Sequence, residues 1–141
     1  LQASGDWDKA TKRMVEAGIN LKKAGAEALV ICTNTMHKMA ADVESGSGLP
    51  VLHIADATAK AIKQKKLRTV GLLATRFTME QDFYKGRLKE QHRINAIIPN
   101  DDNRTAVHQI IYEELCKGIV KDSSKERYLS IMKELIENGA E

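Results

Sequence analysis

The sequence predicts an α/β fold, with parallel strands flanked by helices, and three observations support it. Apolar residues at helical spacing alternate along the chain with short continuous apolar runs, which are typical of buried strands. Single helices separate these runs, and such units make right-handed crossovers between parallel strands. The 141 residues are 43% hydrophobic and 29% charged, which is the composition of a globular protein rather than a disordered one.

The first third of the chain predicts a helix, a strand and a second helix. Five apolar residues spaced 3, 4, 3 and 4 apart form one helix face, and they are Trp7, Ala10, Met14, Ala17 and Leu21. Gly25 ends this helix, because glycine readily adopts the left-handed conformation that closes helices. Residues 28–31 are a continuous apolar run, which predicts a strand covered on both faces, and residues 35–44 return to helix.

The middle of the chain repeats this alternation. A loop rich in glycine and serine over 46–50 precedes a strand over 51–54, and a helix opens at Asp56, a good N-cap residue. Residues 69–74 predict a third strand, and residues 78–90 predict a long helix after it.

The last third adds one strand and two helices. Residues 94–98 form the strand, which Pro99 ends. Two sets of apolar residues at helical spacing follow, namely Val107, Ile110, Ile111 and Leu115, then Tyr128, Ile131, Met132, Leu135 and Ile136. The loop over 45–50 is the expected boundary between two lobes, with 1–48 as the C-terminal part of a first α/β lobe and 49–141 as most of a second.

Both ends of the sequence indicate an internal piece of a longer fold. The chain begins at Leu1 rather than at methionine, and its first predicted element is a helix. It ends on Gly139-Ala140-Glu141 after a helix, whereas the same three residues at 25–27 lead directly into the strand over 28–31. We therefore expect a fold that is incomplete at both ends.

Charge and composition exclude several classes of partner. Lysine and arginine total 22 against 19 acidic residues, and the resulting net charge of +3 is too small for a nucleic-acid-binding surface. The dense basic run over 60–68 is interpreted as the solvated end of a helix, with an anion or phosphate patch as the alternative. No apolar run reaches the ~18 residues of a membrane span, so we expect no membrane partner. Two distant cysteines without a secretory signal indicate a reducing cytoplasm.

Cys32 is the first candidate for chemistry. It ends a predicted strand and is followed by three polar residues, Thr33, Asn34 and Thr35, at the edge where parallel α/β sheets bind ligands. The start of the next helix favours the thiolate form, which can act as a nucleophile or a base. The alternative is a buried structural cysteine.

A second polar strand end follows residues 69–74. The hydroxyls of Thr75 and Thr78, with nearby backbone N–H groups, could bind a carboxylate, while ordinary helix capping explains the same residues equally well. Arg76 between them could pair with a ligand carboxylate or form a surface salt bridge. Cys116, near the C-terminal end of a helix, is expected to have a packing role, because that end disfavours a thiolate.

The histidines predict no metal centre. No histidine pair has zinc-motif spacing with a cysteine, and no glycine-rich nucleotide loop occurs, so neither a metal nor a cofactor is expected. His37 could form a catalytic pair with Cys32, although residues at such a position more often line a pocket or face solvent. His53, inside a strand, is interpreted as a core or rim histidine.

Four segments of the sequence resemble the aspartate/glutamate racemase family. They are 32–38, 52–58, 71–84 and 110–118, and they match the bacterial amino-acid racemase branch of the Asp/Glu/hydantoin racemase superfamily in order. The resemblance implies a cofactor-independent racemase of two pseudo-symmetric lobes with its active site in the cleft between them. One cysteine then removes the α-proton of the substrate, and a second returns a proton to the opposite face.

The resemblance also assigns residues. Cys32 matches the catalytic cysteine of the first lobe, and the positions matched to substrate binding are Thr33, Asn34, Thr35, Thr75 and Thr78. The second cysteine of the family lies in a strand beyond Glu141, and Cys116 does not match it, so the piece as it stands is expected to be inactive. The implied partners are a small amino acid or dicarboxylate and a second copy of the chain, as a cytoplasmic homodimer.

Two alternatives stay open at this point. A decarboxylase or isomerase of the same superfamily would use a single cysteine, and the sequence shows only the first one. A non-catalytic protein that binds an amino acid or a dicarboxylate would carry similar polar strand ends.

Overall fold

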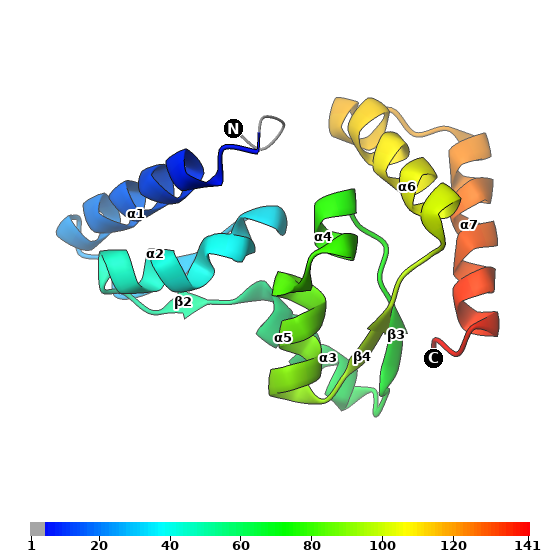
Figure 1. Ribbon diagram of the computed structural model, residues 1–141, viewed down its shortest axis with the longest axis horizontal. Helices are drawn as coiled ribbons and strands as arrows, with labels where there is room; N and C mark the ends of the chain where they lie inside the picture. The colour runs from blue at the N-terminus through cyan, green and yellow to red at the C-terminus, as the bar shows by residue number, and fades with distance from the viewer. Residues whose placement is uncertain (1–4) are drawn as a thin grey trace. The chain divides into compact units, whose positions relative to one another are not determined.

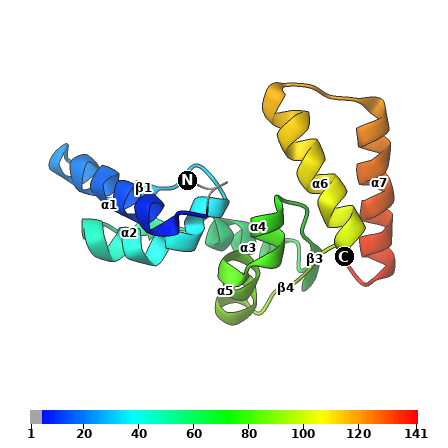
Figure 2. The ribbon, with the colours of Figure 1, turned by 45° about the horizontal axis from the view of Figure 1, so that its top comes forward.

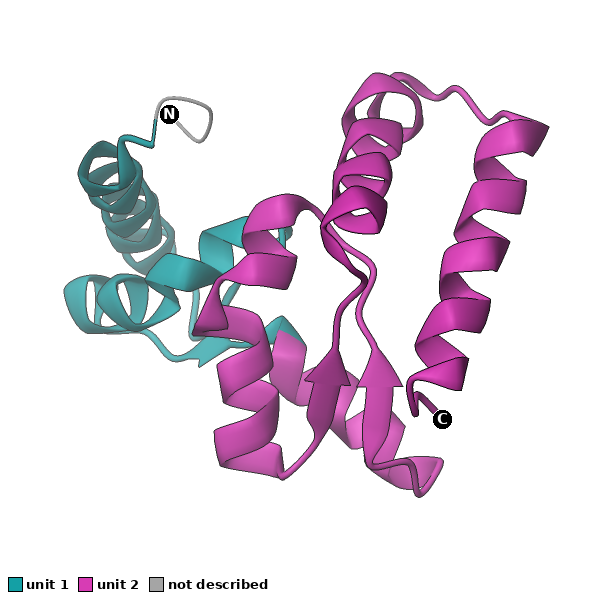
Figure 3. Cartoon of the chain, turned by 45° about the vertical axis from the view of Figure 1, so that its right-hand side comes forward, with its two compact units in different colours: residues 1–54 teal, residues 55–141 magenta. Residues whose placement is uncertain are grey.

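Four short strands form two parallel pairs in the computed structural model, which describes residues 5–141. Contacts divide the chain into unit 1, Leu1–Ile54, and unit 2, Ala55–Glu141 (Figure 3). Unit 1 extends beyond residue 48, because the strand that follows this point pairs within unit 1. The predicted α/β class is confirmed, since each parallel pair is flanked by helices. Among residues 5–141, every helix is too short or too polar to cross a membrane.

Unit 1 packs its helices against one face of a single strand pair. Its first helix, α1 (Trp7–Lys23), begins after Asp6, whose carboxylate accepts a hydrogen bond from the Lys9 N–H at 3.2 Å. The other elements are β1 (Leu29–Val30), the 3-10 helix η1 (Thr35–Met39), α2 (Ala40–Ser47) and β2 (Val51–Leu52). β1 and β2 run parallel, with Leu29 opposite Val51.

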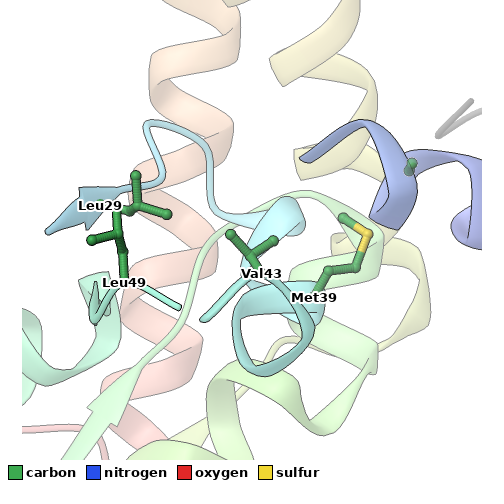
Figure 4. Packing of buried hydrophobic residues seen from close by; sticks show 5 residues of the cluster. Leu29, Met39, Val43 and Leu49 are labelled. Atoms are coloured by element: carbon green, nitrogen blue, oxygen red, sulfur yellow. The ribbon is translucent and has the colours of Figure 1, made fainter. Parts of the chain in front are cut away.

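The core of unit 1 is built from α1, η1, α2 and the strand pair (Figure 4). Its buried residues are Ala10, Leu29, Met39, Val43 and Leu49. Leu29 faces this core, whereas the next residue, Val30, points to the opposite face and is 67% exposed. Leu52, the strand partner of Val30, is 60% exposed. The expectation that this strand is covered on both faces is therefore wrong, because unit 1 packs its helices against the Leu29 face.

Small residues let α1 and α2 approach each other closely. A Cβ atom on Gly18 of α1 would lie 2.8 Å from the Cβ of Ser47 in α2. A Cβ atom on Gly46 of α2 would lie 2.6 Å from a methyl group of Val15 in α1. Both separations are shorter than real carbon–carbon contacts, so glycine is required at these two positions by the packing of the helices.

We expect Gly18→Ala to lower the free energy of unfolding by about 1–3 kcal/mol, because the added methyl group forces the two helices apart. Gly86 in the second unit is the matched control, since a Cβ there would meet the Cβ of Asp82 at an ordinary 3.5 Å. Gly86→Ala is expected to raise the free energy of unfolding by up to about 1 kcal/mol through helix propensity alone. Urea unfolding followed by circular dichroism measures both; equal effects of the two substitutions would contradict the packing argument.

Unit 2 contains the second parallel pair and most of the helices. Its elements in order are α3 (Ile54–Gln64, whose first residue belongs to unit 1), β3 (Thr69–Gly71), α4 (Arg76–Glu80), α5 (Asp82–His92), β4 (Asn95–Ile97), α6 (Asp101–Glu113), the 3-10 helix η2 (Leu115–Lys117) and α7 (Asp122–Glu137). β3 and β4 lie side by side, and α6 and α7 run next to each other in both views (Figure 1, Figure 2).

Helices cover both faces of the β3–β4 pair. One buried cluster joins the pair to α3 and α5, and its members are Ala55, Ala59, Tyr84, Leu88 and Ile94. The other joins it to α4, α6 and α7, and its members are Met79, Val107, Ile131 and Leu135. Val70 packs against the first cluster, whereas the adjacent Gly71 lies under Leu135 of the second. Adjacent residues of β3 therefore contact opposite layers of helices.

Two predicted helix boundaries are wrong. α3 begins at Ile54, two residues before the predicted N-cap Asp56, because a distant side chain accepts the Ile54 N–H, as described below. The helix predicted over 78–90 is two helices, α4 and α5, which Gln81 separates with an extended ψ of 154°. Asp56 instead binds Arg87 and His92 through its carboxylate, at 2.7 to 2.8 Å.

The two Gly-Ala-Glu segments that the sequence relates have the same backbone geometry. Gly25 and Gly139 have positive φ angles of 94° and 99°. Ala26 N–H donates to the Leu21 carbonyl at 3.0 Å, and Ala140 N–H donates to the Leu135 carbonyl at 2.9 Å. Such bonds close a helix with a left-handed residue, and both α1 and α7 end in this way.

Candidate active site

The segment after β1 presents its sulfur to solvent. Cys32 is a free, exposed cysteine that directly follows the buried Ile31. Thr33 and Asn34 are exposed as well, whereas Thr35 is only 4% exposed. The alternative of a buried structural cysteine is therefore excluded. The polar turn over 32–34 offers a thiol, a hydroxyl and an amide side chain on one short stretch of unit 1.

The buried side chain of His37 forms a hydrogen bond with the backbone of this turn. Its side chain is 2% exposed, and its Nδ1 lies 2.8 Å from the Thr33 carbonyl oxygen. Its Nε2 lies 3.2 Å from the Ile54 nitrogen and accepts that N–H. Because both ring nitrogens bond backbone groups, neither is directed to the thiol of Cys32, and the catalytic Cys/His pair considered from the sequence is not formed. His37 is also not solvent-facing, which corrects that expectation.

His53 is buried beside His37, at 6% exposure, and its ring centroid lies 4.5 Å from that of His37. Of the core and rim positions considered for His53, the core position is confirmed, but the residue follows β2 rather than lying inside a strand. The two rings together fill the space between η1 and the start of α3 inside unit 1. This pair could not be predicted from the sequence, because fifteen residues lie between the two histidines and neither belongs to a periodic pattern.

The segment after β3 brings Thr75 and Thr78 together in unit 2. Thr75 precedes α4 with an extended ψ of 158°, and its carbonyl accepts the N–H groups of Thr78 and Met79 at 3.0 Å. The two hydroxyl oxygens lie 3.4 Å apart, and Thr78 is only 1% exposed. Thr75 therefore occupies the N-cap position, as the capping interpretation predicts, but its side chain makes no capping hydrogen bond. Paired hydroxyls at this strand end are equally compatible with the carboxylate-binding role, which stays a prediction.

Charged and polar side chains form hydrogen bonds with residues of α4. Arg76 Nε donates to Glu80 Oε1 at 2.9 Å, and Arg104 Nε donates to the same oxygen at 3.2 Å. The surface salt bridge weighed for Arg76 is therefore the interaction that the structure has. The Arg76 N–H donates to His108 Nδ1 at 3.2 Å, so a histidine of α6 supports the start of α4. Sequence reasoning missed His108, since only the packing of α6 on α4 brings it there.

The hydrogen bond from Arg76, followed in effect by that from Arg104, lowers the pKa of the Glu80 carboxyl below 4.5, although partial burial opposes the shift. A carboxyl with a lowered folded-state pKa stabilises the fold above its unfolded pKa, and this contribution is lost as the pH falls through the folded value. We expect the wild type to be slightly more stable than Glu80→Gln at pH 7, with the difference shrinking as the pH falls below 4.5 toward the lowered folded-state pKa. Thermal unfolding of both proteins across pH 3–7 measures this, and a gap that widens in acid would contradict it.

The other residues considered in the sequence analysis, Cys116 and the basic run over 60–68, lie outside the two polar segments after β1 and β3. Cys116 belongs to η2 and is exposed, so the packing role expected for it is wrong: the helix α6 ends at Glu113, before that cysteine is reached. The basic run over 60–68 lies at the C-terminal end of α3, with its lysines exposed, as predicted. Lys60 and Lys63 line a shallow hollow of about 460 Å³ together with Asp56 and His92.

The structure groups the predicted site residues in two sets. One set lies after β1 in unit 1 and comprises Cys32, Thr33, Asn34 and Thr35; the other lies after β3 in unit 2 and comprises Thr75 and Thr78. Each set lies in the segment that follows the carboxyl end of the first strand of a parallel pair, the region where ligands of α/β sheets bind. No group of three metal-binding side chains occurs within residues 5–141.

Comparison with known proteins gives consistent results. A family model described as Asp/Glu/Hydantoin racemase matches residues 1–141. The broad specificity amino-acid racemase RacX of Bacillus subtilis is 27% identical over 106 residues, which are 75% of this chain and 45% of RacX.

Two crystal structures resemble the chain closely. A candidate Asp/Glu racemase from Yersinia pestis is 55% identical, with a TM-score of 0.92 over 99% of this chain and 61% of the other. An aspartate racemase homologue from Pyrococcus horikoshii is 33% identical, with a TM-score of 0.81 over 97% of this chain and 59% of the other. The chain thus spans about half to three fifths of the length of these proteins.

Proposed function

The chain belongs to the Asp/Glu/hydantoin racemase family, and from this premise we propose that its protein is a cofactor-independent racemase of an acidic amino acid such as aspartate or glutamate. The observation that carries the proposal is the exposed thiol of Cys32 at the carboxyl end of β1, within a turn of polar residues. A strand-end thiol that is open to solvent is available for proton transfer, which a buried structural cysteine is not.

Cys32 acts as one of two thiols in this proposal. Its thiolate takes the α-proton of the substrate, and the electron pair of the broken C–H bond is delocalised into the carboxylate. A thiol on the opposite face then donates its proton to the same carbon, so that configuration inverts and one thiolate replaces the other. The chain contributes one of the two acid–base groups, and we assign the second to no residue of it; Cys116 is not proposed for this role.

Hydrogen-bond donors stabilise the negative charge that develops on the substrate carboxylate during this step. We assign them to the polar residues of the two strand ends, namely Thr33, Asn34, Thr35, Thr75 and Thr78. The 3.4 Å separation of the Thr75 and Thr78 hydroxyls suits two donors that converge on one carboxylate. Arg76 is left out of the binding set, because Glu80 already engages its guanidinium group.

Exchange of the α-proton in D₂O tests this function on the full-length protein. Proton NMR is expected to show loss of the α-proton signal of L- and D-aspartate or glutamate, and chiral chromatography is expected to show the opposite enantiomer. Carbon dioxide release without inversion would assign a decarboxylase instead. Tight binding of both enantiomers without any exchange would assign a binding protein, and either result would overturn the racemase.

A further inference from the structure

His37 lies five residues after Cys32, and its contacts reach the same turn twice. Its backbone N–H donates to the Asn34 carbonyl at 3.0 Å, and its ring Nδ1 lies 2.8 Å from the Thr33 carbonyl. His37 therefore donates hydrogen bonds to the carbonyl groups of both residues that directly follow Cys32, namely Thr33 and Asn34. Because the imidazole is 2% exposed, water does not compete for the ring's hydrogen bonds.

The bonding partners define the state of the ring. The Thr33 carbonyl can only accept, so Nδ1 carries the hydrogen; the Ile54 N–H can only donate, so Nε2 carries the lone pair. A neutral imidazole has one donor and one acceptor, and both are used here. His53, packed at 4.5 Å between ring centroids, restricts the rotation of this ring.

The direction of the Thr33 carbonyl determines the direction of the next N–H group. The C=O and N–H of a trans peptide point in opposite directions, and the described residues have no cis peptide bond. With the Thr33 oxygen bound to the buried imidazole, the Asn34 N–H is directed away from it. Asn34 itself is exposed, so its N–H points away from the buried ring within an exposed turn.

We propose that His37 is a positioning residue: its Nδ1–H fixes the Thr33–Asn34 peptide so that the Asn34 N–H donates to the substrate carboxylate beside Cys32. This inference rests on the proposed racemase function. It adds the Asn34 N–H to the site as a hydrogen-bond donor and His37 as the residue that orients it. Ile54 serves as the anchor, since its N–H holds the imidazole from the other side at 3.2 Å.

Two substitutions of His37 by amide residues distinguish the roles of its two ring nitrogens. Asparagine places an amide near the Nδ1 position, so His37→Asn retains a donor for the Thr33 carbonyl and loses the acceptor for Ile54. Glutamine reaches the Nε2 position, so His37→Gln retains that acceptor and loses the donor to Thr33. In the full-length protein, we expect His37→Gln to lower kcat about 10²-fold with little change in KM, and His37→Asn to lower it less than about tenfold. Urea unfolding is measured alongside.

A second measurement does not depend on turnover. Addition of aspartate is expected to shift the Asn34 amide signal in the ¹H–¹⁵N NMR spectrum of the wild type and of His37→Asn, but not of His37→Gln. This pattern without α-proton exchange in the wild type would end the racemase proposal and leave the positioning role standing. An Asn34 signal that aspartate does not shift in the wild type would overturn the positioning role. Equal kcat losses in both variants, following their losses of stability, would overturn it as well.

Discussion

Cys32→Ser is expected to lower the rate of α-proton exchange in the full-length protein by about 10²–10⁴-fold, the usual contribution of a general acid or base. A serine hydroxyl has nearly the size of the thiol but is a far weaker acid, so it forms almost no anion near neutral pH. The exposed position of Cys32 predicts that this replacement leaves packing unchanged. Exchange in D₂O measured by proton NMR for both enantiomers gives the rate, and thermal unfolding gives the stability.

Cys116→Ser is the matched control for this experiment. Cys116 is also a free and exposed cysteine, but it lies in η2, which follows the helix α6 rather than a strand. We expect this variant to retain the exchange rate and the stability of the wild type. Undiminished exchange in Cys32→Ser would contradict the assignment of Cys32 as an acid–base group. A comparable loss of exchange in Cys116→Ser would indicate that replacement of either cysteine impairs the protein in general.

Met79→Ala is expected to lower the free energy of unfolding by about 2–5 kcal/mol. Met79 is fully buried, at 0% exposure, and it packs with Val107, Ile131 and Leu135 in the cluster that joins α4 to α6 and α7. Truncation removes buried apolar surface and leaves a cavity that three helices must close. The adjacent Thr78 is buried on the same short helix, so α4 is expected to loosen around it.

Met132→Ala provides the comparison with identical chemistry on an exposed surface. Met132 lies on α7 and is 46% exposed, so its replacement is expected to change the free energy of unfolding by less than about 0.5 kcal/mol. Urea unfolding of the two variants by circular dichroism measures the difference. If Met79→Ala proved as mild as Met132→Ala, the cluster around α4 would not be the core that its burial indicates.

The order and type of the elements could be predicted because they depend on local pattern. The apolar spacing correctly predicted a helix where α1 lies, although Ala17 and Leu21 of the predicted face are exposed, and the apolar run over 28–31 contains β1. Boundaries that depend on distant residues could not be predicted. α3 starts at Ile54 because His37 accepts its N–H, and Gln81 divides the long helix between Thr78 and Tyr84.

The site was predicted to a similar extent. Position after an apolar strand selected Cys32 and Thr75 as candidates, because a parallel strand presents its carboxyl end to ligands; the structure places them after β1 and β3, and their roles stay predictions. The supports of these residues could not be found from the sequence. His37 and His108 act through backbone groups, the Thr33 carbonyl and the Arg76 N–H, and no pattern of residue types marks such contacts in a sequence.

Both sulfur atoms face solvent, which bears on how the protein must be kept on the bench. In air, an accessible thiolate is oxidised to a sulfenic acid, and exposed thiols of two molecules can join in a disulfide. Reductant reverses both changes, but it does not reverse further oxidation to the sulfinic acid. If Cys32 is the acid–base group proposed above, a sample aged without reductant would lose activity, and either cysteine could join two chains covalently while the fold stays intact. Freshly reduced protein is the proper starting material for every rate compared above.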